Sequence, residues 1–328
     1  MSVLVTGGAG YIGSHAAHAL AARGEDVVVL DTLDTGVRAF VPRNARFYQG
    51  SAGDSALVAT IVRDCKIDAV LHFAGSIVVP ESIERPLEYY RNNTAVTLAL
   101  LESCVAQRVN RFIFSSTAAV YGATALAPVP ETAPTNPLNP YGWSKLMVEW
   151  MLADAAHAYD FRYVALRYFN VAGVDSSTGA GQPDRQVPHL IKRAAQVALG
   201  TAEHLEIYGA DYPTRDGTAV RDYIHIRDLV DAHILALGHL RRGGSSGVYN
   251  CGYGTGSTVR EVVAALEGAT EKPLRVRNAP RRAGDAAFCV ANSERLGTTM
   301  GWEPKLNQLD LMVRSALDWE RRMQDAAR

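Results

Sequence analysis

A short apolar segment near the start of the chain runs directly into a glycine-rich turn. Residues 3–5 (VLV) precede residues 7–13 (GGAGYIG), which fit both G-x-x-G-x-x-G and, from Gly8, G-x-G-x-x-G. Between a strand and a helix, such a turn brings backbone N–H groups and a helix N-terminus against a pyrophosphate. The motif therefore predicts a dinucleotide-binding βαβ unit. The residues that we expect at the cofactor are Gly7, Gly10, Tyr11, Ile12 and Gly13.

A carboxylate follows this motif at the spacing that dinucleotide-binding proteins use. Asp31 ends the next β-rich segment, residues 27–31, where it can accept hydrogen bonds from the hydroxyls of the adenosine ribose. A carboxylate at this place also repels a 2′-phosphate. The cofactor that the sequence predicts is thus NAD rather than NADP.

Short apolar segments alternate with helical patterns up to about residue 170, as they do in parallel βαβ units. Helices are expected to start near residues 11, 55, 87 and 141, and the third is expected to be unusually long, from residue 87 to about residue 107. The fold class is therefore α/β, a doubly wound parallel sheet. The expected strands are residues 3–6, 27–31, 46–48, 69–73, 111–115 and 163–167.

The sequence changes character after Asn170, where a Gly- and Asp-rich loop (174–184) leads into shorter elements. We expect an NAD-binding domain formed mainly by residues 1–172 and a smaller, mixed α+β substrate domain formed by residues 173–328, with segments exchanged between them. Thr258 and Glu261 predict a capping box for a helix over 258–267, and a final amphipathic helix is expected over 309–323.

Composition narrows the choice of partners. The 328 residues include 33 Lys and Arg against 34 Asp and Glu, without a long run of one sign, which argues against a nucleic-acid or anionic-membrane partner. The four scattered cysteines form no metal-binding pattern and read as reduced thiols, so we expect no metal site. We also expect no targeting or membrane segment, and hence a cytoplasmic protein.

The candidate catalytic residues follow the expected strand over 111–115. This strand ends in Ser115, Ser116 and Thr117, and about 24 residues later Pro140 opens a helix with Tyr141 and Lys145 one turn apart on one face. A free phenol, with a pKa of about 10, becomes a useful base only where positive charge, here from Lys145 and an oxidised nicotinamide, lowers its pKa. We therefore expect Tyr141 to remove an alcohol proton while Thr117 hydrogen-bonds the same oxygen.

The chain resembles the extended short-chain dehydrogenase/reductase family and, within it, the UDP-hexose 4-epimerases. The resemblance covers nearly the whole chain. It rests on residues 6–15 (TGGAGYIGSH), 72–75 (HFAG), 86–93 (PLEYYRNN), 115–122 (SSTAAVYG), 141–149 (YGWSKLMVE), 167–170 (RYFN), 216–225 (DGTAVRDYIH) and 279–285 (APRRAGD).

The resemblance implies a reaction in which the C4 hydroxyl of a UDP-hexose is oxidised to a ketone, the keto sugar turns over, and the hydride returns to the other face. It makes Tyr141 the base, Lys145 its electrostatic partner and Thr117 the hydroxyl contact. The further cofactor residues that it implies are Ser51, Phe73, Ala74, Gly75, Asn92, Ser115 and Tyr168. The substrate residues that it implies, besides Thr117 and Tyr141, are Asn170, His189, Leu190, Ile207, Tyr208, Arg221, Tyr223, Arg282, Asp285 and Cys289.

Three positions depart from the pattern of many relatives: Ile77 in place of a lysine, Ser51 in place of an aspartate beside the adenine, and His189 in place of an asparagine beside the uridine. Cys289 lies where the relatives border the C2 substituent of the sugar, and its small size predicts that N-acetylated UDP-sugars are also accepted. The resemblance also implies a homodimer built on the helices over 87–107 and 141–158, whose apolar residues include Leu98, Leu101, Met147 and Trp150.

The residues after Thr117 argue against dehydration or decarboxylation of a nucleotide sugar. Related dehydratases and decarboxylases carry carboxyl groups directly after the catalytic hydroxyl, where this chain has Ala118 and Ala119. Without a carboxyl group there, acid-assisted loss of water has no catalyst. Another nucleotide-sugar epimerase of the same family, or a non-catalytic NAD-sensing protein on the same fold, is the alternative to the reaction above.

Overall fold

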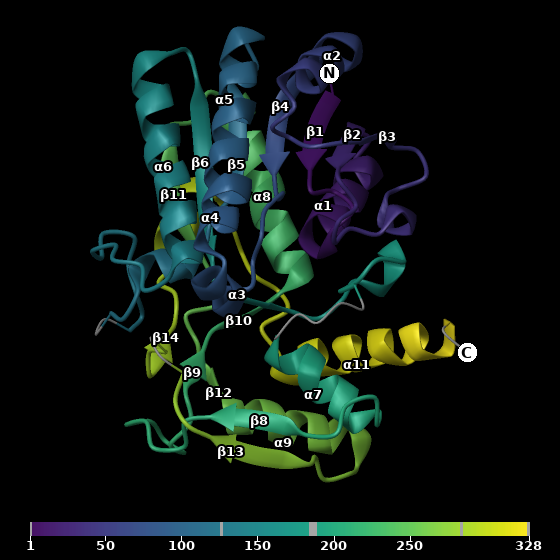
Figure 1. The fold of residues 1–328 in the computed structure, drawn as a ribbon, viewed down its shortest axis with the longest axis vertical. Coiled ribbons are helices and arrows are strands. Elements are labelled where there is room, and N and C mark those ends of the chain that lie inside the picture. Colours follow the sequence, from purple (N-terminus) through teal and green to yellow (C-terminus); the bar gives the residue numbers. More distant parts are fainter. Residues whose placement is uncertain (1, 125–126, 184–188, 283–284, 327–328) are drawn as a thin grey trace.

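A computed structural model describes residues 2–124, 127–183, 189–282 and 285–326. Its larger part is a seven-stranded parallel sheet with strand order β11-β6-β5-β4-β1-β2-β3 (Figure 1). The strands are β1 (Ser2–Thr6), β2 (Asp26–Asp31), β3 (Arg46–Gln49), β4 (Ile67–His72), β5 (Arg111–Ser115), β6 (Arg162–Tyr168) and β11 (Gly247–Cys251). The doubly wound α/β fold is confirmed, and all six expected strands lie within two residues of their expected bounds.

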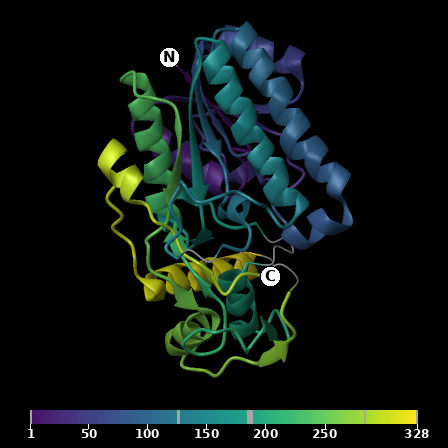
Figure 2. The same ribbon diagram turned by 90° about the vertical axis from the view of Figure 1, so that its left-hand side faces the viewer.

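Helices cover both faces of this sheet. Alternate residues of β1 serve the two faces: Val3 and Val5 pack with α1 and α8, whereas Leu4 packs with α2, α5 and α6 (Figures 1 and 2). Both faces are therefore buried, which explains why the strands are continuously apolar. The helices of this part are α1 (Tyr11–Ala22), α2 (Ser55–Cys65), α3 (Val79–Glu84), α4 (Pro86–Tyr89), α5 (Val96–Ala106), α6 (Pro140–Ala158), α8 (Ile226–Arg241) and α10 (Glu294–Met300).

The long helix expected over 87–107 is not one regular α-helix. Helix α4 continues through a π-helical segment, Tyr90–Ala95, before α5 begins at Val96. Neither this change of pitch nor the short helix α3 was predicted, because the π-helical segment bonds the loop after β4 and α3 packs on α4 and α6, neither of which shows in local periodicity.

Short strands and three α-helices build the described portion of the smaller part, which lies below the sheet in Figure 1. Its two-stranded sheets pair β7 (Asn170–Ala172) with β10 (Tyr223–His225) and β8 (Leu205–Tyr208) with β13 (Val276–Ala279). A three-stranded sheet holds β12 (Ser257–Thr258), β9 (Val220–Arg221) and β14 (Phe288–Cys289).

Helices α7 (Leu190–Ala198), α9 (Val259–Thr270) and α11 (Leu309–Ala326) pack together over one apolar cluster in this smaller part. The capping box of α9 is confirmed: Thr258 accepts from the Glu261 N–H, and Glu261 accepts from the Thr258 N–H. The chain then returns to the sheet, because β11 pairs with β6 although almost 80 residues separate them.

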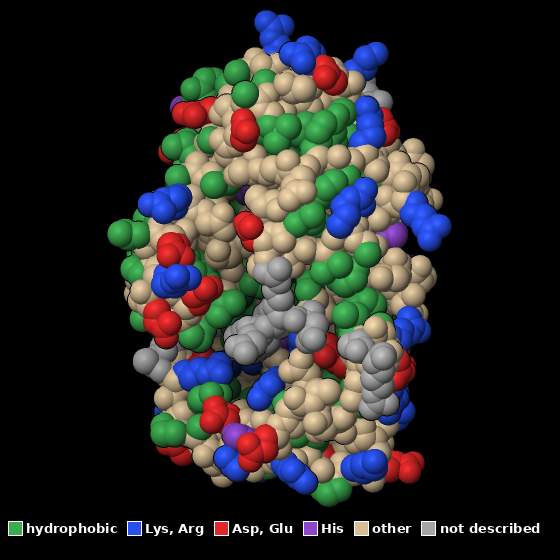
Figure 3. Space-filling model, turned by 45° about the vertical axis from the view of Figure 1, so that its right-hand side comes forward, with side chains coloured by type: hydrophobic (Ala, Val, Ile, Leu, Met, Phe, Trp, Pro, Cys, Tyr) green, Lys and Arg blue, Asp and Glu red, His purple; other side chains and the backbone are tan. Residues whose placement is uncertain are grey.

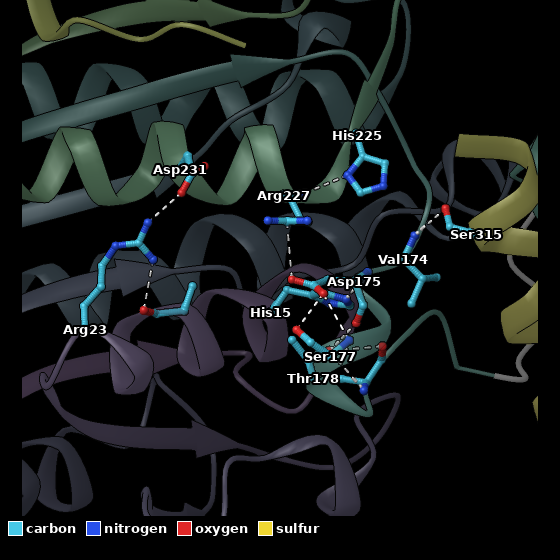
Figure 4. Close-up of polar contacts among 12 residues, drawn as sticks. His15, Arg23, Val174, Asp175, Ser177, Thr178, His225, Arg227, Asp231 and Ser315 are labelled. Carbon is cyan, nitrogen blue, oxygen red and sulfur yellow. Dashed lines mark hydrogen bonds and ion pairs between the residues drawn. The ribbon is translucent and has the colours of Figure 1, made fainter. Parts of the chain in front are cut away.

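A group of polar contacts ties the loop after β7 to the helices around it (Figure 4). The Asp175 N–H donates to His15 of α1, the Arg227 guanidinium of α8 lies 3.6 Å from the Asp175 carboxylate, and the Val174 N–H donates to Ser315 of α11. Arg23 and Asp231 join α1 to α8 at 2.8 Å. These contacts hold the connection between the two parts against the helix that follows the glycine turn.

Acidic and basic side chains are interspersed over the face shown in Figure 3, where no broad area carries one sign only. Within the described ranges, no helix is both long and apolar enough to cross a membrane.

Candidate active site

The glycine turn after β1 forms a backbone cradle that side chains would fill. Gly7 adopts φ +69°, and a Cβ there would lie 2.6 Å from the Ala74 nitrogen. A Cβ on Gly13 would lie 2.2 Å from the Gly7 carbonyl oxygen. Helix α1 then begins at Tyr11, and no side chain caps it. An uncapped helix N-terminus beside closely packed glycines fits a pyrophosphate, so the chain accommodates the NAD that its sequence predicts.

Asp31 closes one side of this cradle. Its carboxylate accepts the Ala9 N–H at 2.9 Å and the Leu33 N–H at 2.8 Å, and only 8% of the residue is exposed. The two hydrogen bonds fix the carboxylate at the end of β2, the place expected for the adenosine ribose. Ser51 lies beyond β3, where its hydroxyl accepts the Gly53 N–H at 3.1 Å.

The loop after β4, with Phe73, Ala74 and Gly75, lies against the π-helical segment. Asn92, which the sequence predicts at the cofactor, donates to the Ser76 hydroxyl at 2.8 Å. Its neighbour Asn93 was not predicted. Asn93 is buried; its side chain accepts the Ser76 N–H at 2.7 Å and donates to the Ser144 hydroxyl of α6 at 3.0 Å. Asn93 thus joins the cofactor loop to the helix that carries Tyr141. Two adjacent asparagines in residues 86–93 were the available sign of a polar role for both. The π-helical pitch that turns both side chains toward the loop cannot be predicted from the sequence.

Thr117, Tyr141 and Lys145 meet at the carboxyl end of β5. Helix α6 starts at Pro140, and Asn139 caps it by accepting the Gly142 N–H at 2.9 Å. Tyr141 and Thr117 are each 8% exposed, and the Thr117 hydroxyl is near enough to the phenol to act on its pKa. Lys145, 3% exposed, donates from Nζ to the Ser115 carbonyl oxygen at 3.1 Å. The structure therefore brings all three predicted catalytic side chains to one place.

Burial dominates the electrostatics of this group. It raises the pKa of Tyr141, against the hydrogen bond from Thr117, which lowers it. Burial also lowers the pKa of Lys145 to about 8. The protein alone therefore does not lower the pKa of the phenol below its ordinary value. The positive charge of the oxidised cofactor is needed, beside that of Lys145, to lower this pKa.

A buried ion pair that the sequence analysis did not single out lies two turns along the same helix. Glu149 follows Tyr141 and Lys145 on one face of α6, and its two carboxylate oxygens share the Arg167 Nε–H at 3.0 and 3.1 Å while one of them also accepts from Nη2 at 2.5 Å. It also accepts from the hydroxyl of Ser116, the neighbour of Thr117. The pair fixes α6 to the ends of β5 and β6. The i, i+4, i+8 spacing of Tyr141, Lys145 and Glu149 places the three side chains on one face of the helix. This spacing does not predict that Arg167 on β6 is the partner of Glu149.

On the substrate side, Asn170 and Tyr223 are paired across β7 and β10. Arg221 on β9 lies beside Cys289 on β14, and its guanidinium approaches the Asp285 carboxylate at 3.4 Å. Cys289 packs against the apolar cluster that contains Ala118, directly after Thr117. The structure thus brings Arg221, Asp285 and Cys289 together and connects them to the catalytic end of β5.

The remaining predicted substrate residues lie on β8, α7 and the loop after β13. The Arg282 guanidinium lies 3.7 Å from the centre of the Tyr208 ring, and the neighbouring Ile207 is 1% exposed. His189 precedes α7, which begins at Leu190; it accepts a hydrogen bond from Gln182 at 2.5 Å, and burial lowers its pKa to about 4. A neutral imidazole has one donor and one acceptor nitrogen, so His189 can still form hydrogen bonds in place of an asparagine.

Comparison with known proteins gives a consistent picture over the full length. The model of the NAD dependent epimerase/dehydratase family matches residues 3–252. A UDP-glucose 4-epimerase of Azospirillum brasilense is 52% identical over 324 residues, covering 99% of this chain and 93% of the relative.

Solved structures agree with this result. The UDP-glucose 4-epimerase from Stenotrophomonas maltophila, with bound NAD and formylated UDP-arabinopyranose, superposes with a TM-score of 0.96 at 40% identity and covers 99% of each chain. The UDP-Glc/GlcNAc 4-epimerase of Campylobacter jejuni gives a TM-score of 0.86 at 41% identity, covering 98% of this chain and 99% of that one. Together with the glycine cradle and the Tyr–Lys helix, these matches establish that the chain belongs to the NAD-dependent epimerase/dehydratase family.

Proposed function

We propose that this protein interconverts UDP-galactose and UDP-glucose with NAD as its resident cofactor. The observation that carries the proposal is the meeting of Thr117, Tyr141 and Lys145 at the strand end beside the glycine cradle. The full-length similarity to UDP-glucose 4-epimerases supports the same reaction.

Tyr141 is the base for the C4 hydroxyl of the sugar, and Thr117 hydrogen-bonds the same oxygen and so orients the C4–H bond. NAD, when bound, takes up the hydride from C4 and gives it back. Tyr141 returns its proton to the oxygen as the hydroxyl forms again on the other face. Lys145, held by the Ser115 carbonyl, supplies positive charge beside the phenolate.

The two parts of the chain divide this work. Residues 1–172, with α8 and β11 added, hold the NAD, and the rest of residues 173–328 hold the UDP-sugar. Arg221 and Arg282 bind the diphosphate, because guanidinium groups form strong paired hydrogen bonds with phosphate oxygens. The uridine side rests on Leu190, Ile207 and Tyr208. With the nucleotide anchored there, the keto sugar can turn over in the pocket without being released.

Dehydration is disfavoured by the same geometry. The turn after Thr117 is a 3₁₀ helix over Ala118–Tyr121, and its first two side chains are methyl groups. No acid is therefore available at this turn to protonate a leaving hydroxyl. A non-catalytic role on the same fold would not need Thr117, Tyr141 and Lys145 together.

Direct assay tests the proposal. Purified protein incubated with UDP-galactose, without added reductant, is expected to yield UDP-glucose, because the hydride removed is returned in each turnover. Tyr141→Phe removes the base, and we expect turnover to fall at least about 100-fold. Circular dichroism and bound NAD should stay near those of the unmutated protein. Near-normal turnover by the variant would show that Tyr141 is not the base.

We further propose that the chain forms a homodimer through the face built by α5 and α6. Leu98 and Trp150 are 45% and 50% exposed, respectively, whereas Leu101 is buried in the core of its own chain. Exposed large apolar residues on adjacent helices are typical of an interface between subunits. Leu98→Glu combined with Trp150→Glu should shift the mass in solution from dimer to monomer, as light scattering can measure. A monomeric mass for the unmutated protein at micromolar concentration would contradict this proposal.

A further inference from the structure

His233 lies behind the cofactor site, in the middle of α8. It is fully buried, and its ring is 4.8 Å from that of Phe73 and 6.3 Å from that of Tyr168, measured between centres. Both aromatic residues belong to the predicted NAD site. The glycine and Tyr-x-x-x-Lys motifs give no hint of this histidine, because α8 follows β5 by more than 100 residues.

The hydrogen bonds of His233 fix its tautomer. Its Nδ1 lies 2.9 Å from the Leu229 carbonyl oxygen, and a carbonyl can only accept, so Nδ1 carries a proton. Burial lowers the pKa of the ring to about 4, so the imidazole is neutral near pH 7. Nε2 is then an acceptor, and the Ser115 hydroxyl, 2.9 Å away, must donate to it.

Ser115 lies between His233 and the residues expected at the nicotinamide. Because its proton is committed to His233, its hydroxyl oxygen can only accept a hydrogen bond from any further neighbour, and the ring of Tyr168 lies beside that of His233. The carbonyl oxygen of the same residue accepts from Lys145 Nζ at 3.1 Å. One serine therefore contacts His233 with its side chain and Lys145 with its backbone, next to the ring of Tyr168.

We infer that His233 is a positioning residue for the nicotinamide end of the cofactor site, acting through Ser115 on Tyr168 and Lys145. The inference rests on the proposed NAD-dependent function. His233 is not a catalytic residue, since it contacts neither the proposed base nor the sugar pocket. Its effect is to give the hydroxyl of Ser115 a single direction and to hold the strand end on which Lys145 rests.

The first test compares two substitutions at this position. His233→Leu removes both ring nitrogens, whereas the amide oxygen of His233→Gln can replace Nε2 as the acceptor for Ser115. For the Leu variant we expect kcat to fall about 10- to 100-fold and the dissociation constant of NAD to rise about tenfold, with KM for UDP-galactose changed less than about threefold. The Gln variant should recover most of both losses. Equal losses in the two variants would overturn the inference.

Leu237→Ala is the matched control for damage to α8. Leu237 is buried one turn further along the same helix, within the apolar cluster that packs α8 on the sheet. Removal of its methyl groups should lower Tm but leave kcat and NAD affinity near those of the unmutated protein. If Leu237→Ala lowers kcat as much as His233→Leu does at an equal loss of Tm, weakening of the helix explains the effect and the inference is wrong.

Ser115→Ala removes the same hydrogen bond from its other partner, and it serves also where His233→Leu does not fold. If His233 acts through Ser115, the double variant loses no more NAD affinity than the more affected single variant, whereas additive losses overturn the inference. This cycle measures NAD binding and does not need UDP-galactose turnover. An unmutated protein that binds NAD but does not convert UDP-galactose would therefore contradict the proposed function and leave the positioning role to be decided by the cycle.

Discussion

The cofactor side and the substrate side of the candidate site are built by different means. On the cofactor side, backbone groups of one continuous sheet shape the cradle, as the distances around Gly7 and Gly13 show. On the substrate side, side chains from two- to four-residue strands of three small sheets shape the site. A backbone cradle is sensitive to a single added methyl group, whereas a site made of side chains loses its contacts one at a time.

The largest effect that this comparison predicts is at Gly13. In Gly13→Ala, the new Cβ would lie 2.2 Å from the Gly7 carbonyl oxygen, so the backbone of the turn has to move. We expect the dissociation constant of NAD to rise at least about tenfold, with a parallel loss of turnover, as measured by calorimetry on cofactor-free protein and by assay.

Gly268→Ala is the control on the substrate side. Nothing lies within 4 Å of a Cβ at Gly268, in the last part of α9, and alanine favours a helix over glycine by about 1 kcal/mol. Tm should therefore stay the same or rise, with NAD binding unchanged. Normal NAD binding by Gly13→Ala would show that the cradle tolerates side chains and would remove the contrast between the two sides.

A smaller and more selective effect is expected for Arg282→Gln. Loss of one charge-assisted contact with the diphosphate should raise KM for UDP-galactose roughly 10- to 100-fold, with a lesser change in kcat. Steady-state kinetics with both UDP-hexoses measure this split.

The neighbouring Arg281 provides the comparison. It lies on the Tyr212 ring and pairs with the exposed Asp211 at 2.8 Å. Such an exposed pair contributes little, so Arg281→Gln should leave KM within about threefold. If Arg281→Gln and Arg282→Gln raise KM equally, the assignment of Arg282 to the diphosphate is wrong. The positive charge of the whole loop, rather than one arginine, would then attract the substrate.

This difference also explains how much could be predicted from the sequence. Strand periodicity and glycine spacing are local, so the six strands, the cradle, Asp31 and the Tyr141–Lys145 pair could be placed. Features that depend on contacts between residues far apart in the sequence could not, such as the seventh strand β11 or the bond between His233 and Ser115. The substrate residues came from resemblance alone, because no local pattern joins Tyr208 to Arg282.

The smallest effect on UDP-galactose turnover is expected from a change that alters only which sugars are accepted. Such a change tests one side chain of the substrate site by itself. Cys289 is half-buried beside Arg221 and packs against the cluster that contains Ala118, so it lies between the expected diphosphate site and the catalytic strand end. We expect its small side chain to leave room near the sugar, and one related structure is described as a UDP-Glc/GlcNAc 4-epimerase. We therefore expect the protein to convert UDP-N-acetylglucosamine and UDP-N-acetylgalactosamine as well.

Cys289→Tyr should fill this space and suppress conversion of the acetylated pair at least about tenfold, while turnover of UDP-galactose changes less than about threefold. Cys289→Ser keeps the size of the side chain and should accept both classes of substrate. Conversion of each sugar by the three proteins, measured alongside Tm, separates exclusion from damage, because overpacking of a core position lowers stability by about 1–3 kcal/mol and would slow both classes alike. Equal loss of both classes in Cys289→Tyr would make Cys289 a core residue, and no turnover of acetylated sugars by the unmutated protein would show that another side chain already closes the pocket.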